Sequence, residues 1–398
     1  MTWILMVGLA TSVQDEAELV QKAYRDGRFA EAADRFEKAL EKEKKNPQLW
    51  VALGHASIQA GRGDAAVRAY REAIALKAET ADLHRALARA LDAGSRMEEA
   101  IVSLRRAMVL DPEGSDALSI ARLLIGREAW LRAEQELLMF LRTAPSSIEG
   151  MEALAFVLAR SGRVTQAKEI YRELIRRSPT EAKYWVAQAR LAASQGQYGE
   201  AIDALEGVRH LAGLTEEDER LLADVYLQEK MYAEAAACYA RRLRVSNPPK
   251  ADDAYRLGHA YFESGQWVSA REAFQQVLKI EPRHGGTVLS LGRLAMVEGN
   301  IEEARKQFAQ AMEWMPESPQ PALALGSLEL KGSFWVKAAE AFREALRRGA
   351  TDSTVWYDQV FSWHKAGKKD EAMRALREAL HGYPFDERLR NLLQEMEK

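Results

Sequence analysis

Few residues of this chain are spaced for catalysis or for holding a metal ion. The seven histidines are scattered along it: His55, His84, His210, His259, His284, His364 and His381. The one cysteine, Cys238, excludes an internal disulfide and a cysteine-cluster metal site. The phosphate-loop, zinc-protease and serine-hydrolase motifs (G-x-x-x-x-G-K-[ST], H-E-x-x-H and G-x-S-x-G) are absent. We therefore expect no catalytic site, cofactor or metal, and we look for residues that bind a partner.

Composition narrows the class of protein further. The chain has 398 residues, 47% of them hydrophobic and 29% charged, which is typical of a folded chain rather than a disordered one. Its formal net charge of −3 argues against a generally basic nucleic-acid binder, although it leaves a local basic stripe open.

The N-terminus carries a short apolar stretch, residues 3–10 (WILMVGLA). At eight residues it is too short to span a bilayer, which takes about 20 apolar residues in a helix. Two interpretations of residues 1–12 stay open. Gly8 and Ala10 fit a signal-peptide cleavage pattern, which would place the protein outside the cytoplasm, in the periplasm. Alternatively, the segment packs on the first helix of a cytoplasmic protein.

One period of 34 residues organises almost the whole chain. Eleven alanines mark it: Ala32, Ala66, Ala100, Ala133, Ala167, Ala201, Ala235, Ala270, Ala304, Ala338 and Ala372. Four residues after each alanine stands a large apolar side chain, and twelve residues before it usually stands glycine or alanine. Each unit also holds two stretches with the i, i+3, i+4, i+7 apolar spacing of amphipathic helices. The pattern predicts eleven helical hairpins, with small residues where the two helices cross.

Glycines punctuate the middle of many units. They are Gly27, Gly61, Gly162, Gly196, Gly265, Gly299 and Gly367. We expect each to end a first helix in the left-handed conformation that glycine adopts without strain.

The pattern resembles the tetratricopeptide repeat family, W-x2-L-G-x2-Y followed by Ala, Phe and Pro. The second unit carries Trp50, Leu53, Gly54, Ala66 and Tyr70, and the eighth carries Leu257, Gly258, Tyr261, Ala270, Phe274 and Pro282. The resemblance covers residues 13–386. It implies an all-α, right-handed superhelical solenoid of antiparallel helix hairpins, whose first helices line a concave groove.

Three segments follow from this alignment. Residues 1–12 form the apolar N-terminal segment, residues 13–386 the eleven repeats, and residues 387–398 an amphipathic capping helix. A one-residue insertion with Pro248 and Pro249 separates units seven and eight. Residues 246–250 are therefore either an ordinary turn between repeats or a bend in the array.

Carrying the family's groove positions over to this sequence gives two sets of candidate binding residues. The first set is basic: Arg85, Arg89, Arg122, Arg190 and Arg220, with Phe156 among them. Arginine can pair with the carboxylates of an acidic peptide through its planar fork. The alternative is that these arginines are solvated or paired within the protein, since acidic residues such as Asp82 and Glu152 are interspersed.

The second set is apolar and aromatic and lies in units eight to eleven. It comprises Tyr255, His259, Phe262, Arg293, Met296, Tyr357 and Phe361, with Leu289 and Leu323 at equivalent positions. Such a strip fits a peptide or helix partner. The alternative is that some of these side chains pack against neighbouring helices. The lysine–asparagine clamp that some relatives use for a C-terminal carboxylate is not reproduced here.

We therefore expect a non-enzymatic scaffold or adaptor that binds a peptide or protein in its concave groove. A more specific version is an assembly factor of a bacterial envelope or secretion complex. Two alternatives are an accessory subunit of a separate transferase or protease complex, and a helical-repeat RNA binder, against which the acidic net charge argues. The oligomeric state is left open.

Overall fold

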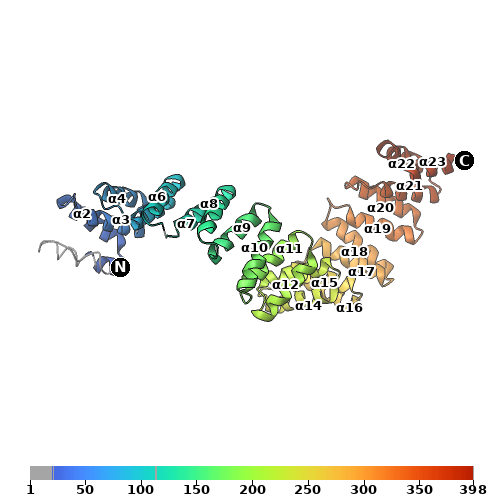
Figure 1. Cartoon of the computed structure of the whole chain (residues 1–398). Helices are drawn as coiled ribbons and strands as arrows, with labels where there is room; N and C mark the ends of the chain where they lie inside the picture. Colours follow the sequence, from blue (N-terminus) through green and yellow to red (C-terminus); the bar gives the residue numbers. More distant parts are fainter. Residues whose placement is uncertain (1–19, 21, 113, 398) are drawn as a thin grey trace. The chain divides into compact units, whose positions relative to one another are not determined.

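The computed structural model describes residues 20, 22–112 and 114–397, and all regular secondary structure in this part of the chain is helical. Helices α2 to α23 follow one another along it (Figure 1). The apolar segment 1–12, for which a signal peptide and a packed extension are the two open interpretations, lies outside the described residues. Among the described helices none is long and apolar enough to cross a membrane.

The helices alternate with the predicted period, two to a repeat. The first helices are α3 (Pro47–Gln59), α5 (Ala81–Ala93), α7 (Asp116–Gly126), α9 (Ile148–Arg160), α11 (Ala182–Ser194), α13 (Glu216–Gln228), α15 (Ala251–Glu263), α17 (Gly285–Val297), α19 (Gln320–Lys331) and α21 (Ser353–Lys365). The second helices are α2 (Phe29–Lys42), α4 (Gly63–Ala75), α6 (Met97–Leu110), α8 (Trp130–Thr143), α10 (Val164–Arg177), α12 (Tyr198–Leu211), α14 (Tyr232–Val245), α16 (Trp267–Ile280), α18 (Ile301–Trp314), α20 (Trp335–Arg347) and α22 (Lys369–Gly382). The last helix, α23 (Glu387–Glu397), buries Leu389, Leu392 and Met396 in a cluster with residues of α21 and α22.

The turn inside each hairpin has a left-handed residue. All seven turn glycines predicted from the sequence have a positive φ, between 71° and 81°. In the four repeats that lack a glycine there, Ser95, Glu128, Lys230 and Ser333 take the same conformation, with φ between 57° and 59°. The geometry of the hairpin therefore requires this conformation whichever residue occupies the turn.

Small residues let the paired helices approach closely. A Cβ atom placed on Gly54 of α3 would lie 2.3 Å from Cε1 of Tyr70 on α4, so only glycine fits beneath that ring. All eleven marker alanines of the second helices are fully buried. The spacing that the sequence shows thus corresponds to direct helix–helix contact.

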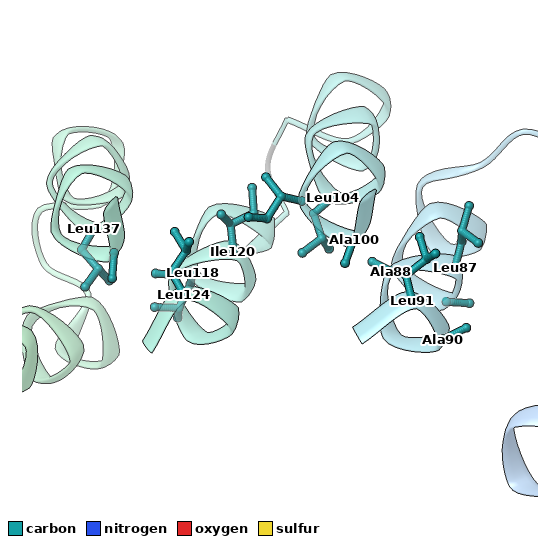
Figure 2. Close-up of a cluster of buried hydrophobic side chains, with 14 of the residues drawn as sticks. Leu87, Ala88, Ala90, Leu91, Ala100, Leu104, Leu118, Ile120, Leu124 and Leu137 are labelled. Carbon is teal, nitrogen blue, oxygen red and sulfur yellow. The ribbon is translucent and has the colours of Figure 1, made fainter. Parts of the chain in front are cut away.

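The chain folds as two compact units that divide between Leu191 and Ala192. In the first unit, one apolar cluster runs through several repeats without a break, and Figure 2 shows part of it in α5 to α8. Its members include Leu91 of α5, Leu104 of α6, Leu124 of α7 and Leu137 of α8, all buried. Such sharing of a core between neighbouring repeats is how a solenoid stabilises hairpins that cannot bury their own faces.

Contacts between repeats identify the inner face of each unit. Successive first helices touch one another at α3–α5 and α7–α9 in the first unit, and at α15–α17 and α17–α19 in the second. Among the described helices, no contact of comparable extent joins consecutive second helices. The first helices therefore lie on the more closely spaced, inner side, and the second helices lie on the outer side.

Residues 246–250 connect α14 to α15 within the second unit. A buried ion pair joins the two helices on either side of this segment, with Arg242 Nη2 lying 3.0 Å from Asp253 Oδ2. Arg242 also donates a hydrogen bond to the backbone carbonyl of Glu216 on α13. The helices that flank residues 246–250, the ordinary turn or bend of the sequence analysis, are thus held together by buried charge.

Candidate partner-binding groove

In the first unit, the candidate arginines of α5 and α7 line one small pocket on the inner face. This pocket, about 250 Å³ in volume, is called here the basic groove pocket. Its wall includes Arg85 and Arg89 from α5 and Arg122 from α7. These three side chains thus line one common pocket; whether they bind a partner stays a prediction.

Two of these three arginines are neutralised by carboxylates of the chain itself. Arg85 pairs with Asp116 at 2.8 Å, Asp111 at 2.6 Å and Asp82 at 2.9 Å, and these hydrogen bonds, above all the one to Asp116, raise its pKa. Arg122 pairs with Glu149 at the surface. Arg85 therefore has a structural role, because it binds α5 to the segment that begins α7.

Arg89 is the exception in this pocket. It is exposed, and no carboxylate lies within ion-pairing distance of it among the described residues. Its charge acts instead on His55 of α3, whose pKa is lowered first by burial and then by Arg89. Arg89 is thus the cation of this pocket that no carboxylate of the described residues neutralises.

The remaining residues of the first set are dispersed. Phe156 on α9 is exposed and contacts Trp130 edge to face, with ring centroids 6.1 Å apart, and the Arg160 guanidinium lies over the Trp130 ring. Arg190 on α11 has at least one interaction partner within the protein, so it is not a free cation. Arg220 on α13, in the second unit, pairs with Asp252 at 2.7 Å and with Asp224.

The second set divides into three groups. Tyr255 and His259 of α15 are half-buried in an aromatic cluster, their rings 4.6 Å apart and both packed against Phe274. Burial is the main cause of the lowered pKa of His259, and the charges of Arg293 and Arg256 add to it. For this pair, packing describes the environment better than an open groove does. Leu289 is buried as well.

Tyr357 and Phe361 of α21 form the second group. Their rings stack at 6.0 Å with an interplanar angle of 17°. Two cations cover them, since Arg388 lies 5.8 Å above the Tyr357 ring and Lys365 lies 5.3 Å above that of Phe361. The stacked pair is thereby held in place by its own chain.

The third group forms a real hollow. Phe262 of α15, Arg293 and Met296 of α17 and Leu323 of α19 line one pocket of about 330 Å³, called here the apolar groove pocket, with Phe308 of α18 also in its lining. Arg293 has no carboxylate partner among the described residues. An apolar hollow with one unpaired cation in its wall suits an apolar side chain that has a carboxylate beside it.

Several residues of the two pockets lie outside the groove positions predicted from the sequence. Ser327 in the apolar groove pocket is one period after Arg293, and Ser119 and Asp92 belong to the basic groove pocket. Extending each candidate position by one period would have found Ser327. The others come from a neighbouring turn of helix, which only the packing of adjacent repeats reveals. No cluster of three metal-ligating side chains occurs in the part of the chain described.

Comparison with known families agrees with this geometry. Family models described as tetratricopeptide repeat match residues 23–90 and 261–328, and a second such model matches residues 323–387. A model described as the EMC2 TPR-like repeat domain matches residues 131–282. The chain is a tetratricopeptide repeat protein. Its helices agree with about eleven repeats, as the sequence predicts.

Solved structures resemble this tetratricopeptide repeat protein in fold. The C-terminal part of a repeat protein from Cytophaga hutchinsonii has 14% identity and a TM-score of 0.50, over 61% of this chain and 98% of that one. A tetratricopeptide repeat protein from Parabacteroides merdae has 18% identity and a TM-score of 0.43, over 63% and 99%. A chain of the Cut9–Hcn1 hetero-tetramer of the APC/C has 15% identity and a TM-score of 0.41, over 98% and 97%.

These identities are low, so the likeness concerns the fold alone. Among curated proteins none matches the chain. Tetratricopeptide repeat proteins generally serve as scaffolds for protein–protein interaction and are typically non-catalytic.

Proposed function

We propose that this protein is an interaction scaffold that binds a peptide segment of a partner protein on the inner face of α15, α17 and α19. One observation carries the proposal: Phe262, Met296 and Leu323 converge on the apolar groove pocket from three successive first helices, with Arg293 in its wall. An apolar side chain of the partner fills the hollow, and an acidic side chain next to it pairs with Arg293.

The chemistry of the lining supports a peptide. Burial of an apolar side chain is favourable by about 1.5–3 kcal/mol when it leaves water entirely, and the thioether of Met296 adapts to side chains of different shape. The planar guanidinium of Arg293 accepts a carboxylate in a bidentate arrangement, which fixes the direction of the segment. Together the two contacts specify a short acidic-apolar motif, in an extended or a helical conformation.

Selection of peptides on the full-length protein tests the proposal. A displayed library of random peptides is selected on the wild-type protein and, separately, on Ser327→Trp, in which a large ring fills the pocket from its exposed edge. Peptides enriched only on the wild type should share an apolar residue next to Asp or Glu. A library that enriches equally on both proteins, or peptides without this motif, would contradict the proposal.

A charge-reversal pair supplies the control. Arg293→Glu should weaken binding of the selected peptides by at least about tenfold, equivalent to 1.4 kcal/mol. Lys306→Glu, an equal change of net charge at an exposed position on α18 outside the pocket, should leave binding within about twofold.

A further inference from the structure

A second pocket lies on the outer side of the second unit, away from the groove of first helices. It has a volume of about 410 Å³ and lies between α20 and α22, with α21 contributing to its lining. Arg343 and Arg347 of α20 and Arg374 of α22 are in its wall, and Trp356 and Gln359 come from α21. We call it the outer pocket.

Two polar groups of α21 in the outer pocket lack partners. Gln359 is only 4% exposed, and its side-chain oxygen accepts no hydrogen bond from the residues that the structure describes. An unsatisfied buried polar group destabilises the fold, and a bound group that donates a hydrogen bond to the amide oxygen removes that penalty. Trp356 is the second case, since its indole N–H has no acceptor among the described residues.

The missing bond at Trp356 is a departure from the two other repeats that have tryptophan at this position. At the corresponding place, the indole of Trp50 donates to the carbonyl oxygen of Lys44 at 2.8 Å, and that of Trp185 donates to Pro179 at 2.9 Å. In both, the acceptor lies six residues before the tryptophan. Trp356 makes no such bond to Ala350, so its N–H is left for another acceptor.

The outer pocket also has a counterpart in the first unit with which it can be compared position by position. That pocket, lined by residues of α2, α3 and α4, has Trp50, Arg68 and Glu72 where the outer pocket has Trp356, Arg374 and Glu378. Each pair is 306 residues apart, which is nine periods of 34. We call it the counterpart pocket.

At four of the equivalent positions the two pockets differ in charge or polarity. Glu37 and Glu41 of the counterpart pocket correspond to Arg343 and Arg347 of the outer pocket, Leu53 corresponds to Gln359, and Ala65 corresponds to Glu371. The wall formed by α20 has therefore changed from acidic to basic, while the wall formed by α22 keeps an arginine, an alanine and a glutamate at equivalent positions and gains Glu371. The side chains of Arg343 and Arg374, on opposite walls, have no carboxylate partner within ion-pairing distance in the described chain.

We propose that the outer pocket is a second binding site, which takes an acidic side chain of a peptide. Arg343 and Arg374 hold the carboxylate, the Trp356 indole donates to it or to the adjacent carbonyl, and the Gln359 amide bonds to the peptide group. A side-chain amide matches a peptide group because each offers one acceptor and N–H donors. This site lies between the second helices α20 and α22, with Trp356 and Gln359 of the first helix α21 in its lining, and it does not depend on the groove proposal.

Full-length protein with ¹⁵N-labelled tryptophan provides the test. The indole ¹⁵N–¹H signals of the full-length chain are recorded during titration with N-acetyl-glutamate amide, with N-acetyl-glutamine amide and with inorganic phosphate. Trp356→Phe and Trp50→Phe assign the two signals. We expect a saturable shift of the Trp356 signal with the glutamate derivative, an affinity at least about tenfold lower with the neutral derivative, and no shift at Trp50.

Two variants separate binding from folding. Arg343→Glu changes an exposed side chain and should abolish the shift. Gln359→Leu installs the residue of the counterpart pocket; it should weaken binding while raising the unfolding temperature, because it removes an unsatisfied buried amide. Arg293→Glu, a change in the apolar groove pocket, should leave the shift of the Trp356 signal unaltered.

Several outcomes would overturn the proposal. These are a Trp356 signal unmoved by the glutamate derivative, equal shifts from the charged and neutral derivatives, an equal response at Trp50, or binding that survives Arg343→Glu. Phosphate that binds as tightly as the glutamate derivative, with no loss in Gln359→Leu, would indicate a general anion site and would contradict recognition of a peptide.

Discussion

Gly258 of α15 lies directly beneath the ring of Phe274 on α16, so that a Cβ atom at Gly258 would come within 2.5 Å of Phe274 Cε1. The same relationship recurs between Gly292 and Phe308, and between Gly326 and Phe342. Where alanine replaces the glycine, the partner is leucine in three repeats and tyrosine in two. Glycine thus stands opposite phenylalanine in these three repeats, where its missing Cβ leaves room for the ring.

Gly258→Ala should destabilise the second unit. The added methyl group overpacks the crossing, at a penalty of about 1–3 kcal/mol, which the better helix propensity of alanine offsets by at most about 1 kcal/mol. Phe274→Leu in the same chain should restore part of the loss, since it imitates the natural Ala88–Leu104 pair. Urea unfolding of the two single variants and the double variant measures the coupling; strictly additive effects would disprove direct packing between the two positions.

Lys230→Gly should stabilise the protein. Lys230 has a φ of 59°, and its side chain is exposed. A left-handed conformation costs a non-glycine residue about 1–2 kcal/mol, of which the greater chain entropy of glycine takes back about 0.5–1 kcal/mol. The net gain should appear as a higher urea midpoint. Glu229→Gly, one residue earlier at a φ of −82°, is the control and should lower the midpoint.

The Arg242–Asp253 ion pair should decide whether residues 246–250 act as a bend. Its side chains are 3% and 1% exposed, so Asp253→Ala leaves a buried guanidinium uncompensated, at a cost of about 3–5 kcal/mol. Limited proteolysis should then cut between α14 and α15 in Asp253→Ala and spare that segment in the wild type. The double variant Arg242→Met with Asp253→Leu removes both charges and should recover much of the stability. Cleavage of the wild type at residues 246–250 would favour a bend that the ion pair does not restrain.

Stability should fall as the pH drops below about 6.5. Burial lowers the pKa of His259 and of His55 from the ordinary value of 6.5. The unfolded chain therefore binds protons at a pH at which the folded chain does not, so that acid favours unfolding until the folded pKa is passed. Thermal midpoints between pH 7.5 and 5.5 should show a shallower slope in His259→Gln than in the wild type. An identical slope would mean that His259 titrates normally in the fold.

The period predicted the helices and the inner face because every repeat places equivalent residues in equivalent contacts. The period could not predict which charged side chains stay unpaired. Most ion pairs between neighbouring repeats join residues that are not separated by a whole period of 34. Arg85 illustrates this: its sequence position is that of a groove cation, but Asp111 and Asp116, 26 and 31 residues later, neutralise it. Arg89 and Arg293 share the same type of position and are not paired in this way. Only the packing of side chains distinguishes the two cases.

A reciprocal charge exchange tests the central claim most directly. A peptide selected on the wild-type protein is synthesised in two forms, with its acidic residue intact or replaced by lysine, and each is titrated by calorimetry into the wild type and into Arg293→Glu. If the apolar groove pocket and Arg293 bind the peptide as proposed, each single change weakens binding by at least about tenfold, and the combination of both changes restores affinity. Independent effects of the two changes, or unchanged affinity in Arg293→Glu, would contradict the account.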